Sequence, residues 1–280
     1  MSDQPSPARS FGSVADAYDR GRPSYPREAG AWLVGDQPQT VLELGAGTGK
    51  LTEVLLGLGH EVHATDPDDA MLARLRERLP DVPTSVASAE ELPAADGSYD
   101  VVVAGQAFHW FDHERALPEI ARALRPGGRL ALIWNKRDER IPWVKRLGRI
   151  IGTQEQETDP TETLVTSGWF GFVENASYKH WQVIDRESVQ DLVLSRSNVA
   201  VLDEDGRRAK LAEVLAFYDD YGRGMDGMQL PYVASCFRAT VVDRPEGAAI
   251  ATTEAGDEGR PATTGGEPTD TDDVLLIDFR

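Results

Sequence analysis

The 280-residue chain carries 47 acidic and 29 basic side chains, a formal net charge of −18. Such a charge opposes non-specific attraction to a phosphate backbone, which argues against a protein that acts on DNA, RNA or tRNA. The single cysteine, Cys236, excludes a disulfide framework and a thiolate metal cluster, and no apolar run reaches the length of a membrane span. Because the first ten residues are polar and resemble no signal peptide, we expect a cytoplasmic protein that contacts neither nucleic acid nor membrane.

The most informative segment, residues 41–52, begins as an aliphatic strand and ends as the start of a helix. Between the two stand three glycines at alternate positions, Gly45, Gly47 and Gly49. Glycines allow a tight turn and leave no Cβ between the loop and a ligand, and the amides of the following helix start point outward. A dinucleotide fingerprint would need glycine in place of Lys50, and a P-loop would need Ser or Thr in place of Leu51. A purely structural turn is the alternative, but we favour a loop that cradles a nucleotide-like ligand.

A second strand, residues 60–66, ends in the carboxylate of Asp66. Asp66 follows Glu43 at about the distance at which a ribose-binding acid follows the glycine loop of nucleotide-binding folds. One carboxylate can accept hydrogen bonds from two ribose hydroxyls. Asp66 could instead cap the next helix. We favour the ribose role for Asp66 and expect Asp68 or Asp69 to be the cap.

Strand and helix patterns continue to alternate up to residue 134. A short strand near 83–87 precedes a wholly apolar run at 101–104, which is typical of a strand buried on both faces of a parallel sheet. A helix closed by Arg-Pro-Gly-Gly leads to a fifth strand at 129–134. This alternation predicts an α/β fold with a doubly wound sheet.

The pattern changes after residue 135. We expect helices at 140–152, 186–195 and 205–221, strands at 179–185 and 229–242, and a polar linker at 153–163. The basic residues near the first of these helices suit its solvated side; they are Arg137, Arg140, Lys145, Arg146 and Arg149. From residue 243 onward the chain is acidic and poor in apolar residues, which indicates disorder.

The order of motifs resembles that of class I S-adenosylmethionine-dependent methyltransferases of the type 11 group, which act on small molecules. The matching motifs are Glu-x-Gly-x-Gly-x-Gly at 43–49, Asp66, Ala-Glu-x-Leu-Pro at 89–93, Tyr-Asp at 99–100 and Leu-Arg-Pro-Gly-Gly at 124–128. Segments 11–19 and 22–26 look like the same group's N-terminal region. The resemblance covers residues 11–135 well and the remainder loosely.

The resemblance implies a Rossmann-like, seven-stranded sheet, mostly parallel with an antiparallel final strand. It also implies four regions: a lid segment at 1–40, the cofactor-binding core at 41–135, completion of the sheet with a substrate-side insert at 136–242, and the acidic tail at 243–280. The insert and the 196–230 helical region would lie over the carboxyl ends of the strands, where open α/β sheets bind ligands.

The resemblance further implies S-adenosylmethionine as cofactor. The methionine part would contact Glu43, Gly45, Ala46 and Gly47. The ribose would contact Asp66, and the adenine would contact Ser88, Ala89 and Glu90. Gln106 would also lie near the cofactor. One position departs from the pattern, because many relatives carry Asp where Ser88 stands. The adenine assignment therefore depends more on the Ala89 amide.

The acceptor would contact Tyr18, Arg22, Tyr25, His109 and Trp110. His109, at the end of the fourth strand, is the candidate base, and a role in contacting or packing against substrate is the alternative. Tyr18 recurs with Phe11 and Val14 at helical spacing, so a core-covering helix stripe is an equal possibility. His109 and His113 lack an acidic third ligand, so we expect no metal site.

These observations predict a methyltransferase that acts on a small organic molecule, with an oxygen acceptor favoured. A carboxylate acceptor needs no base, whereas a hydroxyl or an amine can need one. A cofactor-binding protein without catalysis is the alternative, and a nicotinamide oxidoreductase is opposed by Lys50. No motif in the chain identifies the acceptor or the oligomeric state.

Overall fold

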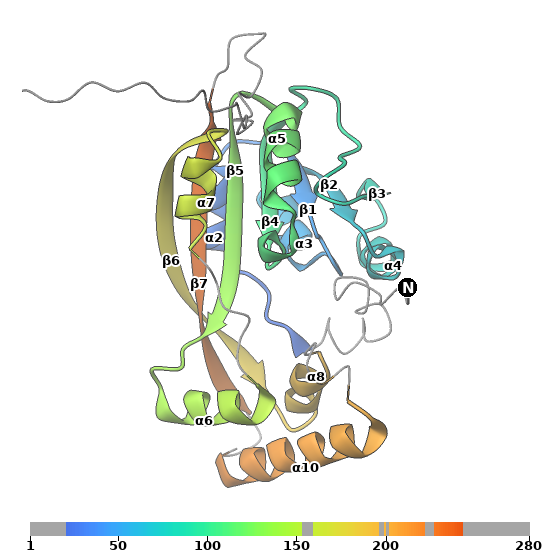
Figure 1. Ribbon diagram of the computed structural model, residues 1–280. Coiled ribbons are helices and arrows are strands. Elements are labelled where there is room, and N and C mark those ends of the chain that lie inside the picture. Colours follow the sequence, from blue (N-terminus) through green and yellow to red (C-terminus); the bar gives the residue numbers. More distant parts are fainter. Residues whose placement is uncertain (1–20, 153–158, 196–198, 200–201, 222–226, 243–280) are drawn as a thin grey trace, which may run out of the picture. The chain divides into compact units, whose positions relative to one another are not determined.

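The computed structural model describes residues 21–152, 159–195, 199, 202–221 and 227–242 (Figure 1). Their seven strands form one sheet in the order β3-β2-β1-β4-β5-β7-β6. The strands are β1 (Thr40–Leu44), β2 (Glu61–Asp66), β3 (Thr84–Val86), β4 (Tyr99–Gly105), β5 (Leu124–Arg137), β6 (Phe170–Ile184) and β7 (Met228–Val241). The first five pair in parallel, and β7 runs antiparallel to both β5 and β6. The predicted doubly wound, mostly parallel sheet is confirmed.

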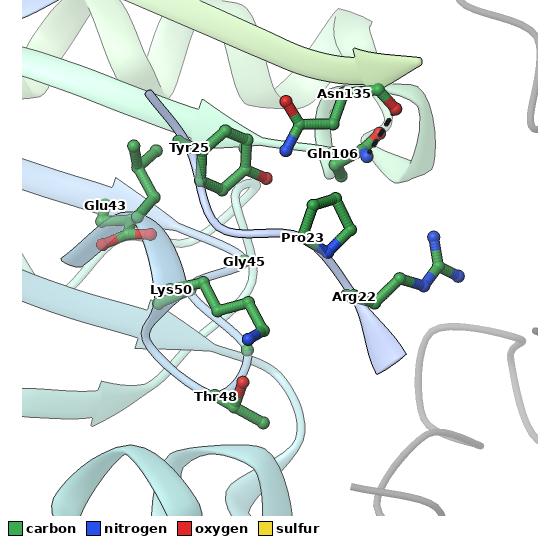
Figure 2. A pocket seen from close by; sticks show the side chains of 13 residues that line it. Arg22, Pro23, Tyr25, Glu43, Gly45, Thr48, Lys50, Gln106 and Asn135 are labelled. Carbon is green, nitrogen blue, oxygen red and sulfur yellow. Dashed lines mark hydrogen bonds between the residues drawn. The ribbon is translucent and has the colours of Figure 1, made fainter. Parts of the chain in front are cut away.

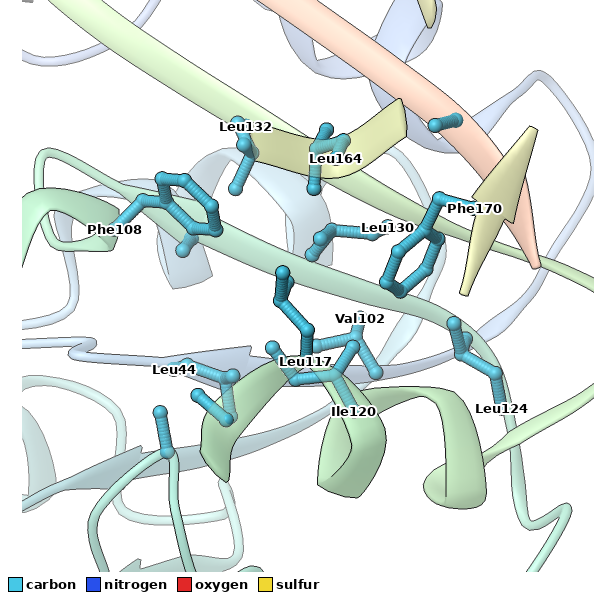
Figure 3. Packing of buried hydrophobic residues seen from close by; sticks show 14 of the residues in the cluster. Leu44, Val102, Phe108, Leu117, Ile120, Leu124, Leu130, Leu132, Leu164 and Phe170 are labelled. Carbon is cyan, nitrogen blue, oxygen red and sulfur yellow. The ribbon is translucent and has the colours of Figure 1, made fainter. Parts of the chain in front are cut away.

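Alternate residues of the central strands enter two different cores. In β4, Val102 and Ala104 pack into one cluster, whereas Val101 and Val103 pack into another. This division follows from the two-residue period of a strand, and it explains why the run must be wholly apolar. Figure 3 shows the first cluster, in which Leu117 packs against the sheet.

Helices cover both faces of this sheet. They are α2 (Arg27–Val34), α3 (Lys50–Gly57), α4 (Asp69–Arg78), α5 (His113–Ala123) and α7 (Thr161–Thr166). Apolar side chains of α5 and α7 enter the first cluster, and those of α2 and α3 enter the second. The sheet is therefore the middle layer of three, which places its strand ends at an edge open to ligands.

Three further helices form a lobe beyond the carboxyl end of β5 (Figure 1). They are α6 (Pro142–Ile151), α8 (Ser188–Leu194) and α10 (Glu204–Tyr221). Their buried side chains share a cluster with Ile184, Leu230 and Tyr232 from the lower ends of β6 and β7. Within the described residues, no helix is both long and apolar enough to cross a membrane.

Several expectations about local structure are confirmed. Asp68 is the N-cap of α4, its side chain accepting from the Ala70 amide at 2.9 Å. Cys236 is buried. The strand expected at 179–185 is part of a longer strand, β6, because every residue from Val173 to Ile184 finds a partner along β7.

Two expectations need correction. Arg137 was expected on the solvated side of a helix, but it lies on β5 with only 4% of its surface exposed. The helix begins only at Pro142, so the apparent helical spacing of the basic cluster does not extend back to Arg137. Helix α2 was not predicted at all, although Pro26 stands at its N-cap. Its apolar residues Ala29, Leu33 and Val34 recur at helical spacing and are fully buried.

Candidate active site

A pocket lies at the carboxyl ends of β1, β4 and β5 (Figure 2). It encloses about 460 Å³, counted out to its open mouth. Its lining comes from the glycine loop, the ends of β4 and β5, and residues 22–26, an irregular segment that we call the strap. The lining residues are Arg22, Pro23, Tyr25, Glu43, Gly45, Ala46, Gly47, Thr48, Lys50, Leu51, Gly105, Gln106 and Asn135.

The glycines of the loop serve different purposes. Gly45 has φ 65°, and a Cβ there would lie 2.5 Å from the Cβ of Ala107. Gly47 has φ 58°, but a Cβ there would meet nothing within 4 Å. Gly45 is therefore required by packing inside the protein. Gly47 leaves open space on its side of the loop, where we predict that the ligand approaches.

Glu43 lies beneath this loop and is almost completely buried, with 1% of its surface exposed. The Thr52 hydroxyl donates to its Oε2 at 2.6 Å. Burial raises the pKa of Glu43 to about 8; the Thr52 hydrogen bond lowers it and the charge of Asp66 raises it further. Glu43 therefore holds a proton at neutral pH and supports the loop without adding a full negative charge.

This raised pKa makes stability depend on pH. The folded state holds the Glu43 proton more tightly than the unfolded chain does. The contribution of this proton to the free energy of unfolding is therefore full below pH about 4.5 and is lost as pH rises through about 8. We therefore expect Glu43→Gln, which cannot ionise, to unfold at higher temperature than wild type at pH 9. The expected gain is about 2 kcal/mol, or roughly 4–8 °C.

Thermal unfolding at pH 5 and pH 9 measures this effect. Glu61→Gln, at an exposed position on β2, is the matched control and should follow wild type at both pH values. Equal pH dependence in wild type and Glu43→Gln would contradict the burial of a protonated Glu43.

Asp66 ends β2 and holds the glycine loop from the side. Its Oδ2 accepts from the Gly47 amide and its Oδ1 from the Asp68 amide, each at 2.9 Å. Burial raises the pKa of Asp66 to about 6, against the lowering effect of these two amides. Each carboxylate oxygen keeps a further lone pair, so the geometry leaves acceptors for ribose hydroxyls. Asp66 is not among the lining residues, and its ribose role stays a prediction.

The residues predicted around the adenine do not line the pocket. Ala89 is buried within the first core cluster. Glu90 accepts from the Asp112 amide at 2.8 Å, which ties the loop after β3 to the start of α5. Ser88 and its neighbours therefore act here as a connection between β3 and α5, and their contact with adenine stays a prediction.

Asn135, at the end of β5, joins four parts of the chain. Its Nδ2 donates to the Ser24 carbonyl at 3.0 Å, and His180 Nε2 donates to its Oδ1 at 2.9 Å. Gln106, with the rare φ of 59°, donates from Nε2 to the Asn135 carbonyl at 3.2 Å (Figure 2). The strap is thus fixed against β5 and β6, and Tyr25 is held with its hydroxyl beside Gly105. Asn135 therefore both lines the pocket and fixes the strap.

Two cationic side chains also line the pocket. Arg22 donates to the Ser195 carbonyl at 3.1 Å, which links the strap to the end of α8. Lys50 extends from the first turn of α3 into the space between the glycine loop and Pro23 (Figure 2). Lys50 was considered only as a residue that excludes a dinucleotide fingerprint. Its position directly after the third glycine was the signal that could have placed it here.

The structure separates the two sequence-predicted substrate groups. Arg22 and Tyr25 line the pocket, whereas His109 and Trp110 do not. They form a short 3₁₀ turn, Phe108–Trp110, in which the two rings pack 4.8 Å apart. Tyr18 lies outside the described residues. No cluster of three or more His, Cys, Asp or Glu suited to a metal occurs in the described part of the chain.

The donor set fits a ligand that combines an amino acid with a nucleoside. Arg22 and Lys50 can balance a carboxylate, Gly47 leaves room for close backbone approach, and the carboxylate of Asp66 stands beside the loop. The N-terminal end of the α3 helix dipole, which begins directly after the loop, adds partial positive charge.

Comparisons with known proteins identify similar chains. A family model described as a methyltransferase domain matches residues 42–132. An uncharacterized methyltransferase of Mycobacterium tuberculosis is 45% identical over 236 residues, covering 83% of this chain and 96% of its own. Malonyl-[acyl-carrier protein] O-methyltransferase of Methylococcus capsulatus is 40% identical over 134 residues, covering 44% of this chain and 48% of its own.

A solved structure shares the fold. Phosphoethanolamine N-methyltransferase 2 of Haemonchus contortus, in complex with S-adenosylhomocysteine, superposes with a TM-score of 0.51 at 16% identity. The match covers 86% of this chain and 61% of that one.

Proposed function

Because the chain belongs to the class I S-adenosylmethionine-dependent methyltransferases and uses S-adenosylmethionine as cofactor, we propose that it methylates an oxygen atom of a small organic acid. The cofactor supplies an activated methyl group on a sulfonium, which passes to the acceptor by in-line displacement and leaves S-adenosylhomocysteine. The protein must therefore position the acceptor and exclude water.

The observation that carries the oxygen-acid assignment is the composition of the pocket wall. Its described charged or titratable side chains are Arg22, Tyr25, Glu43 and Lys50. Glu43 is buried and faces Thr52, so it is poorly placed to take a proton from an acceptor. His109, the predicted base, is outside the lining. A carboxylate is already ionised at neutral pH and needs no base.

The two cations favour the same class of acceptor. Arg22 and Lys50 attract an anion toward the pocket even though the whole chain has a net charge of −18. The malonyl-[acyl-carrier protein] relative is named as an O-methyltransferase, which supports the oxygen acceptor. The proposal includes a cytoplasmic location and no contact with nucleic acid, as the charge indicates.

In this proposal each part of the site has a separate task. The glycine loop and Asp66 bind the cofactor, and Glu43 supports the loop from beneath. Asn135 fixes the strap beside the cofactor, so that Tyr25 and Pro23 exclude water from the methyl group. Formation of a methyl ester consumes one carboxylate charge and one sulfonium charge, and no proton is transferred.

The test is the release of S-adenosylhomocysteine from S-adenosylmethionine with three acceptor panels: carboxylic acids, phenols and amines. We expect turnover to be confined to acids, with a rate at saturating S-adenosylmethionine that is flat above the acceptor's own pKa because no base is titrated. The product should be an ester that mild alkali hydrolyses. Turnover of amines, or a rate at saturating S-adenosylmethionine that rises with the ionisation of a protein group, would contradict the proposal. Cofactor binding without any turnover would indicate a non-catalytic sensor.

A further inference from the structure

A second pocket lies on the other side of the strap. It is a widely open pocket between the strap and residues 180–182 of β6. Its volume is about 680 Å³ when the solvent-filled opening is included. Arg22, Pro23 and Tyr25 line both this space and the cofactor pocket, so the strap is their common wall. A molecule in the second pocket would have only these side chains between it and the cofactor.

The charge on the described wall of the second pocket is positive. Arg22 is the charged residue among its described lining. The pKa of Arg137 is lowered first by burial and also by the charge of Arg22, against the opposing effects of Tyr232 and Glu139. The two guanidinium groups are therefore close enough to repel each other. The guanidinium of Arg22 in the pocket wall favours an anionic occupant.

The remaining wall is neutral. His180 stacks on Tyr232 with ring centroids 5.5 Å apart, and burial lowers the pKa of His180. Its Nε2 is already bonded to Asn135, so the imidazole offers the pocket a neutral ring. Pro23 and Pro26 add apolar surface. This combination suits the carbon skeleton of an organic acid.

Gln182 supplies an unsatisfied acceptor. Its Nε2 donates to the Gly21 carbonyl at 3.3 Å, which fixes the side-chain amide. Its Oε1 is buried and has no hydrogen-bond partner among the described residues. A buried carbonyl oxygen without a donor costs about 1–3 kcal/mol, so a ligand that donates a hydrogen bond there would bind more tightly.

We infer that this second pocket is the acceptor subsite and takes an organic acid that also carries a hydroxyl or other hydrogen-bond donor. The negative charge faces Arg22, the donor bonds to Gln182 Oε1, and the reacting oxygen lies at the strap, on the side of the pocket nearest the cofactor. That the occupant is the methyl acceptor rests on the proposed function. The acceptor would then contact the strap and β6 instead of His109 and Trp110.

The test uses the full chain saturated with S-adenosylhomocysteine and a ligand-observed NMR screen. The probes are small hydroxy-carboxylic acids, each paired with its primary amide. We expect the acids to bind and the paired amides to bind at least about tenfold more weakly. Gln182→Trp, which fills the pocket, should weaken the bound acids by about tenfold or more. Lys179→Trp, exposed on the opposite face of β6, is the matched control and should leave acid binding unchanged.

The affinity for S-adenosylhomocysteine should be the same in wild type and both variants, because neither residue lines the cofactor pocket. Equal binding of acids and amides, acid binding that survives Gln182→Trp, or the absence of any bound probe would overturn the inference. Acid binding that is sensitive to Gln182→Trp but is accompanied by no turnover would instead reject the proposed enzymatic function, while leaving the subsite in place.

Discussion

Gly47→Ala is expected to raise the Kd for S-adenosylhomocysteine about 100-fold or more while leaving the chain folded. A Cβ at this position meets no protein atom within 4 Å, so it projects into the space that the ligand needs. The φ of 58° adds a backbone cost of about 1–2 kcal/mol for an L-residue. Isothermal calorimetry gives the affinity, and thermal unfolding reports the backbone cost.

Gly127→Ala separates these two effects. Gly127 has φ 76°, and a Cβ there also meets nothing within 4 Å, but the residue does not line the pocket. The control should lose similar stability and bind S-adenosylhomocysteine as wild type does. If Gly47→Ala and Gly127→Ala bound S-adenosylhomocysteine with comparable affinity, the open side of Gly47 would not be the side that contacts the ligand.

Asp66→Asn is expected to weaken S-adenosylhomocysteine binding by about 100-fold, because in the proposed ribose role two hydrogen bonds from ribose hydroxyls would lose a charged acceptor. The new amide group also opposes one of the backbone amides that Asp66 now accepts from, Gly47 or Asp68. Calorimetric titration measures the change. Asp69→Asn, at an exposed position in the first turn of α4, is the control and should bind as wild type does.

The same carboxylate predicts how binding depends on pH. Burial raises the pKa of Asp66 to about 6, so the acceptor form is present above pH 6 and is lost as pH falls below it. The affinity of wild type should then fall by up to about tenfold per pH unit below 6. The affinity of Asp66→Asn should not change in that range. A variant that binds within a few-fold of wild type, or that keeps the wild-type pH dependence, would remove Asp66 from the ribose site.

The features that the sequence could predict are local. Glu43, the loop glycines and Asp66 belong to one βαβ unit. Their partners lie a few positions away or on the adjacent strand, so their spacing in the sequence is enough to place them together. The wholly apolar run of β4 likewise identifies a central strand. Three predicted positions of the glycine loop, with Glu43 and Gln106, are therefore found in one pocket.

What the sequence could not predict depends on contacts between distant segments. Asn135 meets Ser24 of the strap and His180 of β6, which lies beyond β7 in a strand order that no periodicity encodes. Arg137 is buried because β5 continues beyond the expected strand, toward the helical lobe. The second pocket exists only where the strap passes β6, so no local motif marks it.

Hydrogen exchange of the full chain, with and without S-adenosylhomocysteine, shows directly which segments the cofactor contacts. With the cofactor in the glycine-loop pocket, we predict slower exchange at the amides of residues 45–50, at Ser24 and Tyr25 of the strap, and at Gln106. We predict little change along α10. Protection confined to other segments, or none at a saturating concentration, would contradict the assignment of the glycine-loop pocket as the cofactor site.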